Sequence, residues 1–346
     1  MAPLTRFRAS DAHIPLQFVV DYYAQRGSVP GTLLVTEATF ISAKAGGYPN
    51  VPTLATDEAL QAWKKVTDAV HAKGSYIFCQ LWALGRIAIP KVLDEEKDAG
   101  ADNIGLVSSS ATPYTDGAPM SRELTEEEIQ SFIGDYAAAA KAAVEVAGFD
   151  GVEIHGAGGY PIDQFTQDTC NRRTDPVAEA VGPGRIGIRL SPWSTYQGMR
   201  MQDPIPQFAY LIKGLKELKL AYLHLVESRI CGNVDVEASD RLDFALDAWG
   251  AGKDNKSPVL IAGGYRPDSA RTTVDEEYKD KNVGIVFGRF FISNPDLVFR
   301  LKKGIEFRPY EREKFYLPKW PAGYTDCEFS DEWKGEEYSK GIKSRL

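Results

Sequence analysis

Residues 151–160 read GVEIHGAGGY. The first half is short, β-branched and largely apolar, which is typical of a buried parallel strand. The second half is a glycine-rich turn that carries His155 and Tyr160. A histidine at a strand's carboxyl end, with a tyrosine five residues later, places a neutral hydrogen-bond donor and a weak acid together. In an α/β barrel, the active site lies at the carboxyl ends of the strands. An isolated pair is equally compatible with a core histidine and a packing tyrosine, so the other strand ends must decide.

The composition describes an ordinary globular protein of 346 residues, 43% hydrophobic and 25% charged. This length suits one closed α/β barrel, which typically has ~250 residues plus insertions. The net charge of −8 argues against a nucleic-acid-binding or acidic-membrane surface, because both need clustered Lys and Arg. No basic-then-apolar leader opens the chain and no apolar run reaches ~18 residues, so we expect a cytoplasmic protein that does not span a membrane.

Neither the cysteines nor the histidines show the spacing of metal ligands. The four cysteines are scattered along the chain, which predicts reduced thiols. The four histidines form no His-x-x-x-His pair. We therefore expect no metal site.

Eight short apolar segments alternate with helical patterns. The predicted strands cover residues 1–5, 31–39, 75–82, 151–157, 185–192, 221–228, 258–264 and 283–290. The predicted helices cover residues 14–26, 57–73, 125–148, 160–173, 206–220, 242–249, 267–281 and 294–304, with Asp57 capping the second and a capping box at Thr125 opening the third. This alternation predicts an α/β fold, a single (β/α)8 TIM barrel. A doubly wound open sheet would need Gly-x-Gly-x-x-Gly between a strand and a helix, and no predicted strand–helix junction has it.

The remaining segments indicate no second domain. Residues 86–123 form a polar insertion that is longer than a normal βα loop, and residues 229–241 form a polar loop. The tail, residues 305–346, is rich in Tyr, Trp and charge. We expect residues 1–346 to form one barrel on which this tail packs.

Polar, aromatic and glycine residues mark the carboxyl ends of the predicted strands, which converge on one mouth of a barrel. They are Thr5, residues 36–39, Gln80, Trp82, His155, Arg189, His224, Glu227, Gly263, Gly264, Gly288 and Arg289. The glycines after the last two strands have no side chain to cover their backbone N–H groups, so these groups can donate to an anion. Together with the Arg289 guanidinium they predict a phosphate site. Gln80 supplies an amide and Arg189 a cation, the groups that the pyrimidine edge of a flavin needs.

Eight motifs distributed along most of the chain carry a family resemblance. They are residues 2–6 (APLTR), 30–36 (PGTLLVT), 80–85 (QLWALG), 151–155 (GVEIH), 163–165 (DQF), 188–192 (IRLSP), 222–227 (YLHLVE) and 288–297 (GRFFISNPDL). In this order they resemble the old yellow enzyme family. The chain is similar to the fungal branch of that family, which includes reductases of ergot-type alkaloid aldehydes.

The resemblance implies a (β/α)8 barrel that carries flavin mononucleotide (FMN) and reduces activated alkenes with NADPH or NADH. The residues that it implies for FMN binding are Thr5, Ala38, Gln80, Arg189, Gly263, Gly264, Gly288 and Arg289. The implied substrate pocket contains Trp82, Gly158, Tyr196 and Tyr316.

The implied reaction is ping-pong. The nicotinamide reduces the flavin and leaves, and an α,β-unsaturated aldehyde or ketone takes its place. That substrate receives the hydride at its β-carbon. His155 would hold the carbonyl oxygen while Tyr160 protonates the α-carbon.

Three departures from the family pattern affect these expectations. The family usually has Asn where this chain has Gly158, so one donor to the carbonyl oxygen is missing, a loss that typically costs ~2.7–4 kcal/mol in the transition state. The family continues after Asp175 with a longer segment, so we expect a shortened helix after the fourth strand. The usual amino-terminal lead-in is absent, so the first strand begins almost at Met1.

Two other functions remain open at this point. One is a redox-neutral flavin isomerase on the same scaffold, although a retained proton donor, Tyr160, favours net reduction. The other is a degenerate barrel with weak or no turnover. We expect a small-molecule enone or enal as the substrate and a monomer or homodimer.

Overall fold

A computed structural model describes residues 1–98, 104–173, 185–232, 234–237 and 239–343. Its centre is a curled sheet of seven parallel strands in the order β1-β2-β5-β6-β7-β10-β11. These strands are β1 (Leu33–Phe40), β2 (Tyr76–Trp82), β5 (Gly151–Gly156), β6 (Ile186–Leu190), β7 (Tyr222–Val226), β10 (Val259–Ala262) and β11 (Val283–Val286). Seven of the eight predicted strands are thus confirmed, with somewhat shorter bounds.

The eighth predicted strand, residues 1–5, is not a regular strand, although it occupies the place of one. The Val35 N–H donates to the Met1 carbonyl at 3.0 Å, and the Ala2 N–H donates to the Phe287 carbonyl at 2.9 Å. The first two residues therefore join β1 to the end of β11 and close the TIM barrel. Pro3 has no N–H, so the ladder cannot continue past it.

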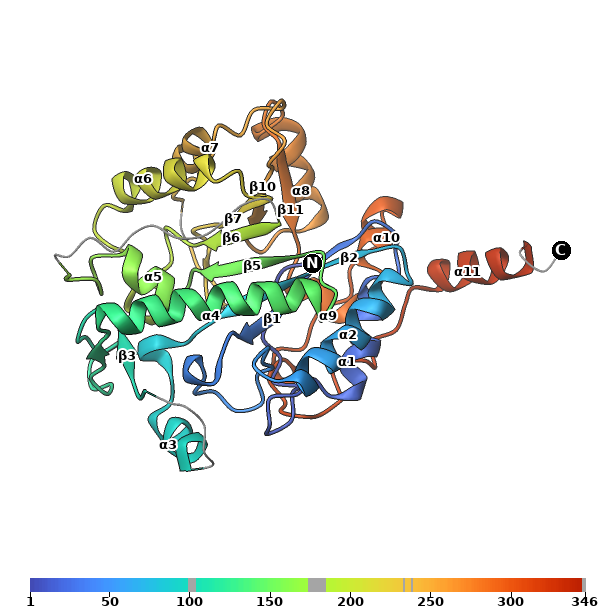
Figure 1. Cartoon of the computed structure of the whole chain (residues 1–346). Coiled ribbons are helices and arrows are strands. Elements are labelled where there is room, and N and C mark those ends of the chain that lie inside the picture. The colour runs from blue at the N-terminus through green and yellow to red at the C-terminus, as the bar shows by residue number, and fades with distance from the viewer. Residues whose placement is uncertain (99–103, 174–184, 233, 238, 344–346) are drawn as a thin grey trace.

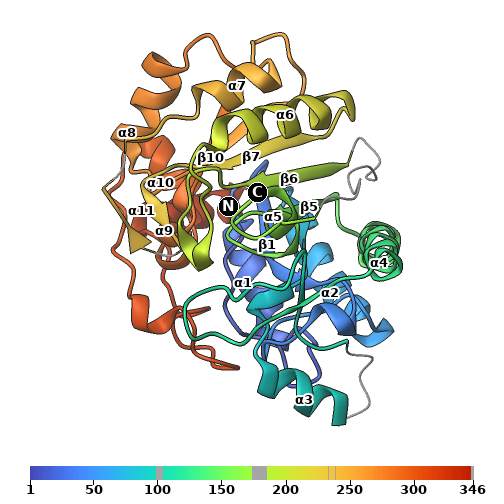
Figure 2. The same cartoon turned by 90° about the vertical axis from the view of Figure 1, so that its left-hand side faces the viewer.

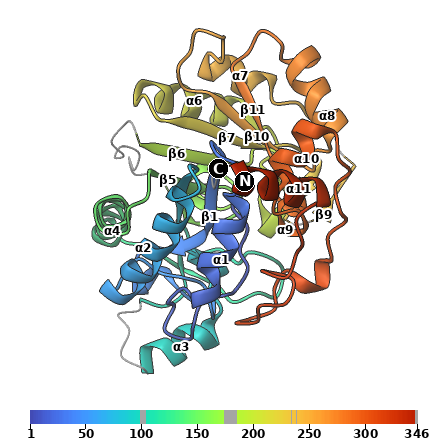
Figure 3. The same ribbon diagram turned by 90° about the vertical axis from the view of Figure 1, so that its right-hand side faces the viewer.

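The helices that surround the barrel lie outside the strands (Figure 1, Figure 2). They are α1 (Gln17–Arg26), α2 (Asp57–His71), α4 (Glu126–Glu145), α6 (Pro204–Glu217), α7 (Asp243–Trp249), α8 (Pro267–Thr272) and α10 (Leu297–Lys303). Figure 3 shows α1 beside α2. None of the helices in the described ranges is both long and apolar enough to cross a membrane.

Helix α2 forms for the reason that its sequence indicates. Leu60, Trp63 and Val66 recur at three-residue steps, and all are buried against the barrel. The cap is one residue earlier than predicted, because the Thr56 hydroxyl accepts the Ala59 N–H at 3.2 Å and Asp57 is the first helical residue. The capping box predicted for α4 is confirmed at Thr125.

Further elements lie in the connections and in the tail. They are α3 (Pro90–Asp98), α5 (Pro161–Thr166), α9 (Arg289–Ser293), α11 (Asp331–Lys343), the pair β3 (Val107–Ser108) and β4 (Arg122–Glu123), the hairpin β8 (Ile230–Cys231) and β9 (Val234–Asp235), and the 3-10 turns η1 (Ala43–Ala45), η2 (Gly85–Ile87), η3 (Tyr196–Gly198) and η5 (Arg312–Lys314).

Several of these elements differ from the prediction. The helix expected over residues 160–173 ends at Thr166, because the backbone at Gln167 is extended. The helix expected over residues 267–281 passes from α8 into one π-helical turn, Thr273–Glu277. The predicted polar loop at residues 229–241 contains the β8–β9 hairpin. The shortened helix expected after the fourth strand involves residues 174–184, which lie outside the described residues.

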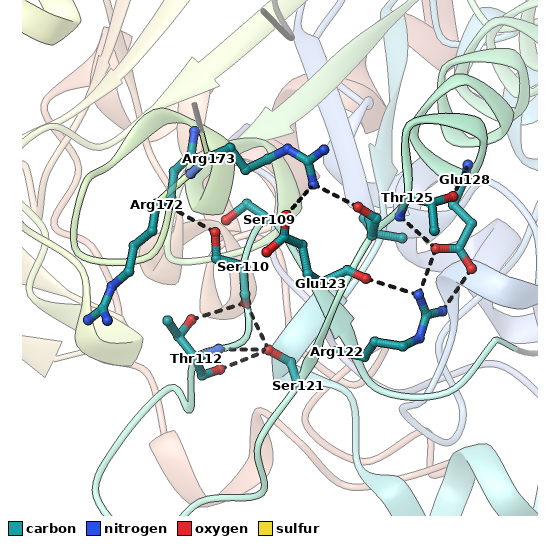
Figure 4. Close-up of polar contacts among 12 residues, drawn as sticks. Ser109, Ser110, Thr112, Ser121, Arg122, Glu123, Thr125, Glu128, Arg172 and Arg173 are labelled. Atoms are coloured by element: carbon teal, nitrogen blue, oxygen red, sulfur yellow. Dashed lines mark hydrogen bonds and ion pairs between the residues drawn. The ribbon is translucent and has the colours of Figure 1, made fainter. Parts of the chain in front are cut away.

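Polar contacts hold the insertion between β2 and α4 in place (Figure 4). The Arg172 backbone N–H donates to the Ser110 hydroxyl at 3.0 Å, and the Ser121 hydroxyl donates to the Thr112 carbonyl at 2.8 Å. Tyr114 lies in the segment between Thr112 and Ser121. These contacts therefore fix a segment that forms part of the cavity wall described below.

Part of the tail is attached to the start of the chain. The buried Arg6 guanidinium donates to the carbonyls of Phe315 (2.9 Å) and Gly323 (2.7 Å). The fully buried Tyr324 stacks on Tyr22, with ring centroids 3.8 Å apart. The start of helix α11 packs on α10, where Trp333 contacts Phe299, and its far end projects away from the barrel (Figure 1).

Candidate active site

A large cavity of about 1310 Å³ opens at the carboxyl ends of the barrel strands. Twelve of the predicted site residues line it: Thr5, Trp82, His155, Gly158, Tyr160, Arg189, Tyr196, Gly263, Gly264, Gly288, Arg289 and Tyr316. The other two, Ala38 and Gln80, are buried behind this surface and do not line it. The structure therefore brings most of the predicted residues to one place.

His155 sits near the end of β5 as a neutral donor. Its Nδ1 accepts the Ala157 N–H at 3.4 Å, which leaves the hydrogen on Nε2. Burial, with the nearby Arg189 cation, lowers the pKa of His155 to about 3. The imidazole is therefore uncharged at neutral pH and still able to donate.

Tyr160 lies beside His155 on the same wall of the cavity. The ring centroids of Tyr160 and His155 are 4.9 Å apart, and Trp82 contacts both rings, stacked on His155 and edge-on to Tyr160. Burial raises the pKa of Tyr160 well above its ordinary value. The phenol therefore keeps its proton and is placed next to a neutral donor.

The turn that positions this pair is held by the DQF motif, residues 163–165. Asp163 Oδ2 accepts the Gly159 N–H at 2.8 Å, and the Gln164 amide donates to the Gly159 carbonyl at 2.7 Å. Gly158 and Gly159 both have positive φ, +66° and +81°, which favours glycine. The motif thus acts by fixing the backbone just before Tyr160.

Glycines at the ends of β10 and β11 form the predicted phosphate cradle. A Cβ on Gly263 would lie 2.4 Å from the Glu227 Cβ, so no side chain fits there. Arg289 reaches this cradle from the start of α9, but both of its terminal nitrogens contact Asp235 of β9, at 2.9 and 2.5 Å. The predicted phosphate ligand is therefore paired with an acidic residue, which no sequence pattern indicated.

A buried polar cluster lies inside the barrel beneath the cavity. The Gln80 amide donates to Glu153 at 2.8 Å, and His224 Nδ1 is 2.8 Å from the same carboxylate. Burial opposes ionisation of Glu153, but the neighbouring His224 and Arg189 keep the carboxyl pKa below its ordinary value. The prediction that His224 belongs to the mouth is wrong, because the fully buried imidazole belongs to this interior cluster.

Sequence reasoning missed several residues that line the cavity. Tyr48 and Tyr114 come from loops, and Gln197 comes from the turn after β6. None of these three residues lies at the carboxyl end of a predicted strand, whereas most of the other site residues were predicted from that position. The Glu153 cluster had a usable signal, because a carboxylate in an otherwise apolar buried strand needs partners.

The cavity suits the FMN that the resemblance implies. Its lining includes both the glycine cradle at Gly263 and Gly288 and the aromatic wall at Trp82. Arg189 Nε is buried and has no hydrogen-bond partner among the described residues, so a cationic donor is available to a ligand. In the described ranges no group of three or more His, Cys, Asp and Glu side chains is arranged to hold a metal ion.

Comparison with known proteins gives consistent results. The model of the NADH:flavin oxidoreductase / NADH oxidase family matches residues 1–178 and 175–308. A chanoclavine-I aldehyde reductase of Penicillium roqueforti is 58% identical over 352 residues, covering 96% of this chain and 93% of that protein. A probable inactive reductase of Epichloe festucae var. lolii is 48% identical over 362 residues, covering 99% and 94%.

The structural comparison shows the same relationship. The crystal structure of old yellow enzyme from a Pichia species superposes with a TM-score of 0.84 at 33% identity, covering 96% of this chain and 89% of that one. The (β/α)8 fold is therefore shared with an old yellow enzyme of known crystal structure. With its fold, its cavity and its sequence in agreement, the chain belongs to the NADH:flavin oxidoreductase / NADH oxidase family, as an NAD(P)H-dependent FMN oxidoreductase of the old yellow enzyme type.

Proposed function

We propose that this protein is an ene-reductase that saturates the C=C bond of an α,β-unsaturated aldehyde or ketone. One observation carries the proposal: an uncharged imidazole, His155, and a protonated phenol, Tyr160, lie side by side on one wall of the cavity. A hydrogen-bond donor beside an acid is the pair that conjugate reduction requires, because charge develops on the carbonyl oxygen while the α-carbon needs a proton.

Each residue then has a defined task. His155 donates its Nε2 hydrogen to the substrate's carbonyl oxygen, which stabilises the developing enolate charge without bringing a second positive charge near Arg189. Tyr160 gives its phenolic proton to the α-carbon. The hydride for the β-carbon would come from FMN when that cofactor is bound. We assign the phosphate of FMN to the glycine cradle and its ring to the neighbourhood of Thr5 and Arg189.

The proposed substrate is an aldehyde with a bulky planar body. Aromatic side chains dominate the substrate half of the cavity, namely Tyr48, Trp82, Tyr114, Tyr196 and Tyr316. Such walls bury flat apolar ligands well. The relative named as a chanoclavine-I aldehyde reductase supports an ergot-type alkaloid aldehyde as the substrate class.

A cytoplasmic location is part of the proposal. None of the four cysteines forms a disulfide, which accords with a reducing compartment.

Separate measurement of the two half-reactions tests the proposal. Under argon, NADPH should bleach the flavin absorbance, and cyclohexenone or a cinnamaldehyde should restore it. Tyr160→Phe should slow the restoration by about 10²- to 10⁴-fold, the usual contribution of a general acid, and leave bleaching nearly unchanged. Equal loss in both half-reactions would show that Tyr160 is not the proton donor.

A second candidate is a protein with little or no net turnover. Gly158 removes one donor from the oxygen site, and relatives 47–48% identical to this chain are named as probable inactive reductases or dehydrogenases. Bleaching by NADPH without restoration by any enone or enal would favour this candidate. Conversion of substrate without consumption of NADPH would favour the isomerase.

A further inference from the structure

Gln197 is held in a fixed and unusual conformation beside the proposed proton donor. It lies in η3, directly after β6, with φ of +58°, which is uncommon for a residue other than glycine. Its backbone carbonyl accepts a hydrogen bond at 3.2 Å from the buried Arg86 guanidinium. Arg86 is itself held by the Thr112 hydroxyl at 2.9 Å and the Pro113 carbonyl at 3.0 Å. The backbone at residue 197 is therefore tied to two other parts of the cavity wall.

The side chain of Gln197 packs on the turn that precedes Tyr160. A Cβ on Gly159 would lie 2.9 Å from the Gln197 Cβ, so this packing depends on the glycine. From there the Gln197 Nε2 donates to the Tyr160 hydroxyl oxygen at 3.4 Å. The Gln197 Oε1 is buried and has no hydrogen-bond partner among the described residues, and the same side chain also hydrogen-bonds Tyr196.

We infer that Gln197 is a positioning residue for the proton donor: its amide N–H binds the Tyr160 oxygen, directs the O–H toward the substrate, and stabilises the phenolate left after proton transfer. This inference rests on the proposed ene-reductase function. A hydroxyl oxygen that accepts from an amide turns its own hydrogen away from that amide, here toward the cavity. In the step itself the Tyr160 O–H bond breaks and a C–H bond forms at the α-carbon. The phenolate then regains its proton from water.

The amide matters because the surroundings of Tyr160 disfavour a phenolate. Burial raises the pKa of Tyr160, and the neighbouring Tyr48 raises it further, whereas the hydrogen bond from Gln197 lowers it. A hydrogen bond to a charged oxygen is about twice as strong as one to a neutral oxygen. The contact from Gln197 therefore strengthens as the proton leaves, which lowers the barrier to the transfer.

The test uses the FMN-loaded full-length protein and three variants at Gln197. Gln197→Leu removes the donor, and Gln197→Glu keeps the shape but offers a carboxylate that accepts the phenol's hydrogen. Gln197→Asn retains an amide that suits positive φ but is one methylene too short for the contact. If one variant fails to bind FMN, the other two still carry the test.

We expect each variant to slow restoration of flavin absorbance by cyclohexenone by about 10- to 100-fold, because a hydrogen bond to a charged group is lost, with Gln197→Glu the slowest. Bleaching by NADPH should change less than about twofold, because that half-reaction needs no proton from Tyr160. A purely structural role would slow both half-reactions together and would overturn the inference.

A double-mutant cycle with Tyr160→Phe gives the decisive result. If Gln197 acts through Tyr160, then Gln197→Leu should have no further effect on restoration in the Tyr160→Phe background. Equal effects of Gln197→Leu in both backgrounds would overturn the inference while leaving the proposed function intact. Failure of the unaltered protein to react with any enone or enal would instead overturn the proposed function.

Discussion

The proposed oxygen-binding corner of the cavity contains two residues, His155 and Gly158. His155 provides a single side-chain donor, its Nε2–H, and Gly158 offers none where the family resemblance implies a second donor. The backbone there has φ of +66°, a conformation in which Asn is among the best-tolerated residues after glycine. A Cβ at Gly158 would meet Tyr160 at 3.7 Å and His155 at 4.0 Å, which are ordinary contact distances. The corner therefore has space for the missing donor.

Gly158→Asn should consequently tighten binding of carbonyl acceptors and of phenols by about five- to tenfold, the value of one hydrogen bond. The measurement is the titration of the charge-transfer absorbance that a bound phenol produces with the flavin. Gly158→Ala is the matched control, since it adds the Cβ in the same strained conformation without the amide. Equal affinities of the Asn and Ala variants would contradict the placement of residue 158 at the oxygen site.

At the scale of elements, the β8–β9 hairpin is the part of the molecule that alters the predicted phosphate site. Asp235 of β9 contacts both terminal nitrogens of Arg289, and Arg312 approaches the same carboxylate at 3.3 Å. These arginines hold the pKa of Asp235 below its ordinary value, against the effect of partial burial. A carboxylate thus occupies the guanidinium face that a phosphate would use.

Asp235→Asn should therefore tighten FMN binding about two- to fivefold, because it removes a competing negative charge whose side chain is more than half exposed. The dissociation constant of FMN, measured by flavin fluorescence with protein stripped of cofactor, checks this expectation. Glu237→Gln is the control, as it neutralises an exposed acidic residue on the same loop. Weaker FMN binding by Asp235→Asn would mean that Asp235 holds Arg289 in place for the phosphate.

At the scale of the whole molecule, the two ends of the barrel sequence stabilise each other. Residues 1 and 2 close the ring between β1 and β11, and Arg6 then binds carbonyls more than 300 residues away, at Phe315 and Gly323. Tyr316, which follows Phe315, lines the cavity. One buried guanidinium thus links ring closure to the shape of the site.

Arg6→Met should lower the free energy of unfolding by about 3 kcal/mol or more, because it leaves buried carbonyls without their charged donor. Urea denaturation monitored by tryptophan fluorescence gives the value. Lys319→Met is the control: Lys319 pairs with the exposed Asp11 at the surface, and such pairs contribute about 1 kcal/mol or less. A loss no larger than that of the control would show that the tail does not depend on Arg6.

Much of the site was predictable from two general properties of parallel strands in a barrel. Buried parallel strands are recognisable as short apolar runs, and their carboxyl ends must converge once the sheet closes. His155, Arg189 and Gly263 were found in this way, and all three line the cavity. The same rule predicted the wrong place for His224. A side chain near the end of a strand points either to the mouth of the barrel or into its interior. The His224 imidazole points into the interior, where it contacts the Glu153 carboxylate.

From the sequence alone follow the alternation of strands and helices, the family motifs, and the turn that presents His155 and Tyr160, since each depends on residues that are neighbours in the chain. Only the tertiary structure decided that Gln197 contacts Tyr160, that Asp235 pairs with Arg289, and that Arg6 reaches the tail. These contacts join residues that lie outside the barrel strands and are between 37 and 317 positions apart in the chain. Loops carry no periodic signal, so which of them meet is settled by the packing of the closed barrel that they surround.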